Sequence, residues 1–317
     1  MFSFVFSSPH AMGAGNSFTS PSHRTSLTPE YETILAKMPL DVKVGQMLMI
    51  GFKGQKIDDS LSLMIKKVKP GAIVLFGRNI RTARQTADLN ESAQSLSRKL
   101  SQVPLLIAAD QEGGNVVRIK TVYPLPSALA LGLADDPGLV LRAGAATGTL
   151  MKTLGLNMNL APVMDVAAPT RSKFLGTRSY SNDPGIVTKM SFGFAEGLET
   201  SGVLPTAKHF PGHGGFEGDS HLAAVENGDG KSQLEKVDLV PFTHMAAQSK
   251  LPWAIMLAHA SYPALDPSRV PATFSRPIVT DLLRGKLGFN GIVLTDDIEM
   301  AGASTVADVN ERAIRAI

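Results

Sequence analysis

The strongest constraint on the fold is a repeated alternation along the chain. From Asp41 onward, short apolar runs bounded by Gly or Pro alternate with longer segments that have helical periodicity. This alternation predicts βα units around a parallel sheet. The runs are nearly continuously apolar, so we expect strands buried on both faces. Seven runs qualify as strands: 45–52, 71–77, 104–110, 156–166, 204–210, 253–259 and 291–297.

The ends of these runs favour a barrel over an open sheet. Polar and ionisable residues lie at the carboxyl ends of these runs, which is where a (β/α)₈ barrel carries its active site. A doubly wound sheet would gather them near one switch point, and no glycine-rich dinucleotide or phosphate-binding loop is present. These residues are Asp110, Gln111, Glu112, Asp165, Lys208, His209, His259, Asp296 and Asp297. We therefore predict an α/β fold of the (β/α)8 TIM-barrel type.

A closed barrel of this type needs eight strands, and only seven are predicted. After the seventh, residues 304–317 have the pattern of a helix that reaches the last residue. We expect a barrel truncated before its eighth strand and spanning residues 29–317. Residues 1–28 are poor in large apolar side chains and are expected to be a disordered tail, or the remnant of a signal peptide with a linker. The compartment therefore stays open between cytoplasmic and periplasmic or secreted.

Composition narrows the classes of function. With 44% hydrophobic residues, 19% charged residues and a net charge of +3, the 317-residue chain is typical of a globular protein. No basic run suggests a nucleic-acid partner, and no stretch is apolar for long enough to span a bilayer. The absence of cysteine excludes a thiolate nucleophile and cysteine-ligated zinc.

The segment "KHFPGHGGFEGDSH", residues 208–221, contains three histidines and admits three interpretations. His209 and His213 have the i, i+4 spacing of zinc ligands, but Pro211 and Gly212 make a helix through them improbable. A loop metal site with Asp219 and His221, a polar turn, and a catalytic loop rich in glycine all stay open. We favour the catalytic loop.

The segment "GIVLTDD" ends in two adjacent carboxylates. Successive side chains on a strand point to opposite faces, so Asp296 and Asp297 are not expected to face one substrate. One would be catalytic and the other structural; alternatively, both would cap the next helix.

Taken together, the motifs resemble the family 3 glycoside hydrolases, and more narrowly their bacterial β-N-acetylglucosaminidase branch. The motifs are "DQEGG", "KHFPGHG", "DSH" and "TDDIEM", in this order, and the resemblance covers about residues 40–317. It implies that Asp296 is the nucleophile, that His221 is the general acid/base and that Asp219 is its partner. Sugar-binding roles are implied for Asp110, Arg118, Arg178, Lys208 and His209. Position 115 is left out because it is Asn where the family usually has a basic residue.

The resemblance implies a retaining exo-β-N-acetylglucosaminidase that acts on carbohydrate ends derived from peptidoglycan or chitin. It would work as a monomer, without metal or organic cofactor, and without a nucleic-acid or membrane partner. It also implies an eighth strand just beyond Ile317. A phosphorylase on the same scaffold, a metal-dependent hydrolase using His209, His213 and His221, and an inactive or binding-only fragment are the alternatives.

Overall fold

The structure is a computed structural model that describes most of the chain. The described residues are 3–7, 29–101, 103–120, 125–167, 175–215, 220, 222–248, 252–304, 306 and 308–317. The proposed catalytic residues Asp219 and His221 lie outside them.

Seven parallel strands form the sheet, and each lies within one of the seven predicted runs. They are β2 (Leu48–Gly51), β3 (Ala72–Val74), β4 (Leu106–Ala109), β7 (Met158–Asn159), β8 (Leu204–Phe210), β10 (Ala254–Leu257) and β12 (Ile292–Thr295). Neighbours along the chain pair in this same order, and every one of these pairs is parallel. The prediction of a curled parallel α/β sheet is therefore confirmed.

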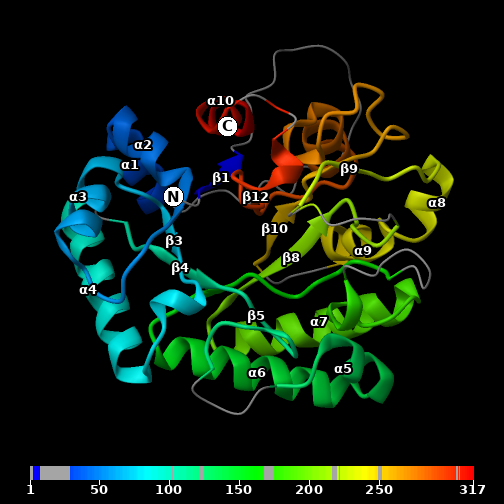
Figure 1. The fold of residues 1–317 in the computed structure, drawn as a ribbon, viewed down its shortest axis with the longest axis horizontal. Helices are drawn as coiled ribbons and strands as arrows, with labels where there is room; N and C mark the ends of the chain where they lie inside the picture. The colour runs from blue at the N-terminus through cyan, green and yellow to red at the C-terminus, as the bar shows by residue number, and fades with distance from the viewer. Residues whose placement is uncertain are drawn as a thin grey trace.

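The N-terminal segment corrects the predicted tail. Ser3–Ser7 form strand β1, which pairs antiparallel with both β12 and β2 and closes the barrel between them. Figure 1 shows β1 beside β12, although the two are far apart in sequence. An open seven-stranded sheet would leave two rows of unpaired backbone groups, and "SFVFS" pairs with part of each row. The prediction of a disordered tail is thus wrong for residues 3–7, and residues 8–28 lie outside the described part.

Helices cover the outside of the sheet (Figure 1). They are α1 (Pro29–Lys37), α2 (Leu40–Gln46), α3 (Asp59–Val68), α4 (Ala83–Ser101), α5 (Ala128–Ala134), α6 (Pro137–Thr153), α7 (Pro184–Thr200), α8 (Lys231–Lys236), α9 (Val240–Gln248) and α10 (Val309–Ala316). A π-helix spans Pro277–Lys286, and short 3₁₀ turns lie at Gly77–Asn79, Gly176–Arg178, Ala272–Phe274 and Ala301–Ala303. Small strands β5 (Gln111–Gly113), β6 (Val116–Val117), β9 (Val225–Glu226) and β11 (Ala260–Ser261) pair outside the barrel.

Helix α7 illustrates how local sequence sets the helix ends. The Asp183 side chain accepts a hydrogen bond from the Ile186 amide, and Pro184 occupies the first turn. Gly202, just past the end, adopts φ +70°, a conformation that favours glycine. Residues close to each end in sequence therefore mark where α7 begins and ends.

The core has an inner and an outer layer. Ala72 and Val74 of β3 belong to the cluster inside the barrel, whereas Ile73 between them packs with the helices outside. All three are fully buried, as expected for a parallel strand. Within the described part of the chain, no helix combines the length and apolar character that a membrane span requires.

Candidate active site

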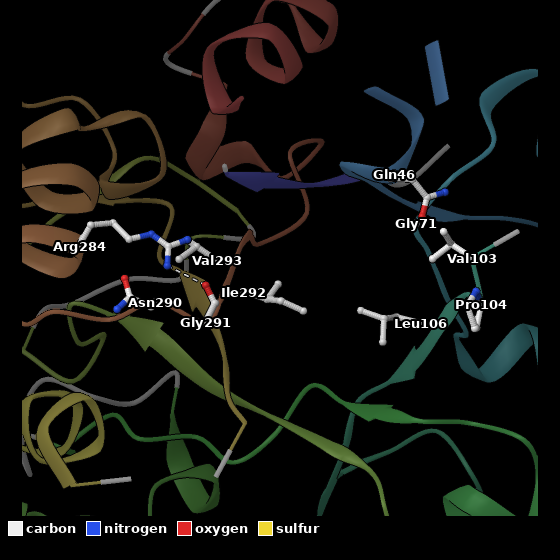
Figure 2. A pocket seen from close by; sticks show the side chains of 10 residues that line it. All are labelled: Gln46, Gly71, Val103, Pro104, Leu106, Arg284, Asn290, Gly291, Ile292 and Val293. Atoms are coloured by element: carbon white, nitrogen blue, oxygen red, sulfur yellow. Dashed lines mark hydrogen bonds between the residues drawn. The ribbon is translucent and has the colours of Figure 1, made fainter. Parts of the chain in front are cut away.

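Among the cavities lined by described residues, two lie at opposite ends of the strands. The amino-end cavity has a volume of about 560 Å³, and Figure 2 shows Leu106 and Ile292 pointing into it from the starts of β4 and β12. It contains none of the predicted site residues. The carboxyl-end cavity has a similar volume, about 550 Å³, and lies where barrel enzymes carry out their chemistry.

The carboxyl-end cavity collects every predicted site residue that the structure describes. These are Asp110, Arg118, Arg178, Lys208, His209 and Asp296. They come from segments far apart in the sequence: Asp110 follows β4, Lys208 and His209 lie in β8, and Asp296 follows β12, so only the folded chain brings them together. Apolar side chains complete the wall, from Phe76, Val116, Leu160, Met256 and Met300.

Opposite charges are paired in the cavity wall. Lys208 Nζ lies 2.9 Å from an Asp110 oxygen and 2.7 Å from Glu112 Oε1. Arg178 donates two hydrogen bonds to Glu112, at 2.9 and 2.8 Å, and Arg118 donates to Asp110 at 3.1 Å. Sequence reasoning noted Glu112 at a strand end but left it out of the site.

Burial and charge pairing shift the pKa values of these groups in opposite directions, and the effect of pairing is the larger. Burial disfavours the charged carboxylates, yet Lys208 and the two arginines hold the pKa of Asp110 and of Glu112 below their usual values. Burial also disfavours the ammonium of Lys208, but Glu112 and Asp110 raise its pKa. All of these groups are therefore charged at neutral pH. Such preorganised ions can make charge-assisted hydrogen bonds to the hydroxyls of a sugar.

Asp165, at the end of the predicted run 156–166, holds His209 in place from behind. Its fully buried carboxylate accepts hydrogen bonds from the backbone amides of His209 and His213, at 3.0 and 2.7 Å. It also contacts His209 Nδ1 at 2.7 Å. An ionised carboxylate can only accept, so Nδ1 carries the proton and the orientation of the ring is fixed.

These contacts predict an acid-dependent stability. Burial opposes ionisation, but His209 and the other donors lower the pKa of Asp165 from 3.8 to about 2. A lowered carboxylate pKa stabilises the fold above the unfolded value, near 4, and this contribution is lost as the pH falls toward 2. At pH 7 it amounts to about 2 kcal/mol.

We therefore expect Asp165→Asn to lower the unfolding free energy by about 2 kcal/mol at pH 7, with the deficit shrinking below pH 4. Urea unfolding between pH 3 and 7 measures this difference. The exposed Asp88→Asn on α4 is the control and should change little. A deficit of the same size at every pH would contradict the assignment.

The two aspartates after β12 correct the argument from strand alternation. Strand β12 ends at Thr295, so Asp296 and Asp297 lie beyond the strand, where alternation does not apply. Both residues line the carboxyl-end cavity. Asp297 also accepts a hydrogen bond from the Glu299 amide at 2.9 Å. Burial, chiefly, raises the pKa of Asp297 to about 6.

Comparison with known proteins agrees with this geometry. The family model described as "Glycosyl hydrolase family 3 N terminal domain" matches residues 39–317. The chain belongs to the family 3 glycoside hydrolases. The predicted resemblance to this family is therefore confirmed.

Several bacterial proteins of family 3 are similar to this chain. A beta-hexosaminidase from Pseudomonas aeruginosa (strain LESB58) is 35% identical over 269 residues, which is 84% of this chain and 77% of that protein. Beta-hexosaminidase A from Pseudoalteromonas piscicida is 33% identical, over 91% of this chain and 52% of that protein. The solved structure of a family 3 β-N-acetylglucosaminidase from Paenibacillus sp. str. FPU-7 has a TM-score of 0.84 and 37% identity, over 88% of this chain and 53% of the other. This chain thus spans about half the length of two of these family 3 proteins.

Two histidines of the metal alternative, His209 and His213, have other partners in this family 3 fold. His209 Nδ1 contacts Asp165, and His213 Nε2 lies 3.1 Å from Ser220 Oγ. Within the described ranges, which omit Asp219 and His221, no group of three or more His, Asp or Glu side chains has the geometry of a metal site.

Proposed function

We propose that the barrel, made of residues 29–317 and closed by strand β1, is the catalytic domain of a retaining exo-β-N-acetylglucosaminidase. One observation carries the proposal: the carboxyl-end cavity holds Asp296 together with ionic and polar side chains suited to sugar hydroxyls, from Asp110, Glu112, Arg118, Arg178, Lys208 and His209. The names of the relatives above support the choice of amino sugar. Peptidoglycan- or chitin-derived saccharides are the proposed substrates, and the working unit is a monomer.

The proposed reaction has two steps. An Asp296 oxygen attacks the anomeric carbon while the imidazolium of His221 protonates the departing glycosidic oxygen, so the C–O bond breaks as the glycosyl ester forms. The neutral imidazole then takes a proton from water, whose oxygen attacks the same carbon and releases Asp296. The two inversions retain the β configuration. Asp219 would stabilise the imidazolium of the first step.

The charged network supplies binding and orientation. Asp110 and Glu112 can accept hydrogen bonds from hydroxyls, whereas Lys208, Arg118 and Arg178 can donate them. Because these ions are paired with one another in the folded chain, the sugar would enter a site whose polar groups are already fixed. A fixed set of dipoles needs little rearrangement as charge develops on the sugar ring.

A specificity assay tests the proposal. We expect hydrolysis of 4-nitrophenyl N-acetyl-β-glucosaminide at a kcat/KM at least about 100-fold above that for the matched β-glucoside. The same assay with phosphate distinguishes hydrolase from phosphorylase. Phosphate at roughly 10–50 mM would saturate a phosphorylase, because typical KM values do not exceed about 1 mM. A rate that rises with phosphate and yields a sugar phosphate would favour the phosphorylase. Loss of activity with a chelator would favour the metal alternative, and no turnover of either substrate would overturn the proposed function for this chain.

A further inference from the structure

We infer that Ser220 is a positioning residue for the proposed acid/base pair Asp219 and His221. Its contacts hold it between the segment after β8 and the segment after β12, which carries the proposed nucleophile Asp296. Its side chain is held by His213 from the β8 side, and its backbone is held by Gly302 from the turn after β12. This inference rests on the proposed function, because it concerns the residue between Asp219 and His221.

The first attachment is through the Ser220 hydroxyl. Ser220 Oγ lies 3.1 Å from His213 Nε2, and both side chains are only 3% exposed. Burial, chiefly, together with His209 lowers the pKa of His213 to about 4. The ring is therefore neutral at the pH of an assay, and its contact with Ser220 is a neutral hydrogen bond sheltered from solvent.

The backbone around His213 is held in place by contacts with Asp165, Val166 and Tyr262. The His213 backbone amide donates to Asp165, the same carboxylate that orients His209 in the cavity wall. The next residue, Gly214, passes so close to the Val166 carbonyl that a β-carbon would lie 1.7 Å from its oxygen. Tyr262 donates a hydrogen bond to the Gly212 carbonyl at 2.8 Å. The buried carboxylate of Asp165 thus holds both His209, a proposed sugar-binding side chain, and His213, which contacts Ser220.

The second attachment is through the backbone. The Gly302 amide donates to the Ser220 carbonyl at 2.8 Å. A β-carbon on Gly302 would lie 2.8 Å from that oxygen and 2.6 Å from the His259 carbonyl oxygen, so this close approach requires glycine.

The segment after β12 contains both Gly302 and Asp296, the proposed nucleophile. His259 Nε2 lies 3.0 Å from the Asp297 carbonyl oxygen, and its Nδ1 lies 2.8 Å from Thr273 Oγ1. Ser220 is therefore held between two segments. One follows β8 and contains His213, and the other follows β12 and contains Asp296.

The position of Ser220 matters because Ser220 is covalently linked to Asp219 and His221. Consecutive Cα atoms are about 3.8 Å apart, so fixing Ser220 limits where Asp219 and His221 can lie. Releasing Ser220 should misplace the proton donor by a fraction of an ångström to an ångström, which can cost up to about 100-fold in rate. Substrate binding should change little.

The test compares Ser220→Ala with wild type on two aryl N-acetyl-β-glucosaminides. For the 4-methoxyphenyl compound, a poor leaving group that needs protonation, we expect kcat/KM to fall roughly 10- to 100-fold. For the 2,4-dinitrophenyl compound, which leaves without a proton, kcat/KM should fall less than about threefold. Gly302→Ala is expected to show the same selective loss. Ser304→Ala removes a local hydroxyl contact with Ala301 and is the control.

Each outcome separates this inference from the proposed function. Equal losses on both substrates, or no loss on either, would overturn the positioning role while leaving the function intact if His221→Ala shows the selective loss. A His221→Ala variant without that selectivity would overturn the acid/base assignment itself. Hydrogen exchange gives a readout independent of turnover: the Gly302 amide should exchange faster in Ser220→Ala than in wild type, and unchanged exchange would contradict the attachment.

Discussion

Replacing Asp296 with alanine should lower kcat/KM for 4-nitrophenyl N-acetyl-β-glucosaminide by about 10³-fold or more. A loss of this size corresponds to about 4 kcal/mol of transition-state stabilisation. The physical reason is that no other group would form the glycosyl ester, although the charged network of the carboxyl-end cavity would still bind the sugar. KM should therefore change much less than kcat.

Azide provides the matched control for Asp296→Ala. The small anion can occupy the space of the missing carboxylate and attack the anomeric carbon once, with a single inversion. We expect rescue of the rate and an α-glycosyl azide product. Asp88→Ala, an exposed site on α4, should retain wild-type turnover without azide. Wild-type activity in Asp296→Ala would contradict its role as nucleophile.

Replacing His221 with alanine should produce a loss that depends on the leaving group. General acid catalysis contributes about 10²–10⁴-fold, so kcat/KM for the 4-methoxyphenyl substrate should fall by that factor. For the 2,4-dinitrophenyl substrate, glycosylation should proceed almost normally and the later hydrolysis step should limit kcat. The glycosyl-enzyme would then accumulate, and KM would fall with kcat.

The azide product distinguishes His221→Ala from Asp296→Ala. With the nucleophile intact, azide attacks the glycosyl-enzyme from the opposite face, and two inversions give a β-glycosyl azide. An α product from His221→Ala, or an equal loss of rate on both aryl substrates, would remove His221 from the acid/base role.

The sequence predicted the sheet well because parallel strands are buried on both faces. Such burial leaves a local signature, a nearly continuous apolar run, and all seven strands lie within such runs. Some of the candidate site residues were predictable for a related reason: in a barrel, the carboxyl ends of all strands meet at one face. Asp110, Lys208 and Asp296 follow this rule and line one cavity.

What sequence reasoning missed depends on long-range contacts. Strand β1 is set by the edges of β2 and β12, and β12 is almost the whole chain away. The pairing of Glu112 with Arg178 joins residues 66 positions apart, and nothing local reveals it. That Asp296 and Asp297 both line the cavity depends on where β12 ends, and the ends of elements are the least certain feature of a sequence pattern.

Trapping the covalent intermediate tests the central claim most directly. The protein would be incubated with a 5-fluoro-N-acetylglucosaminyl fluoride, whose intermediate forms faster than it hydrolyses, and then analysed by intact mass and peptide mapping. We expect a mass increase of one fluorosugar per chain, located on Asp296 and absent from Asp296→Ala. No mass increase in a chain that hydrolyses the aryl substrate, or a sugar attached to another residue, would contradict the proposed mechanism.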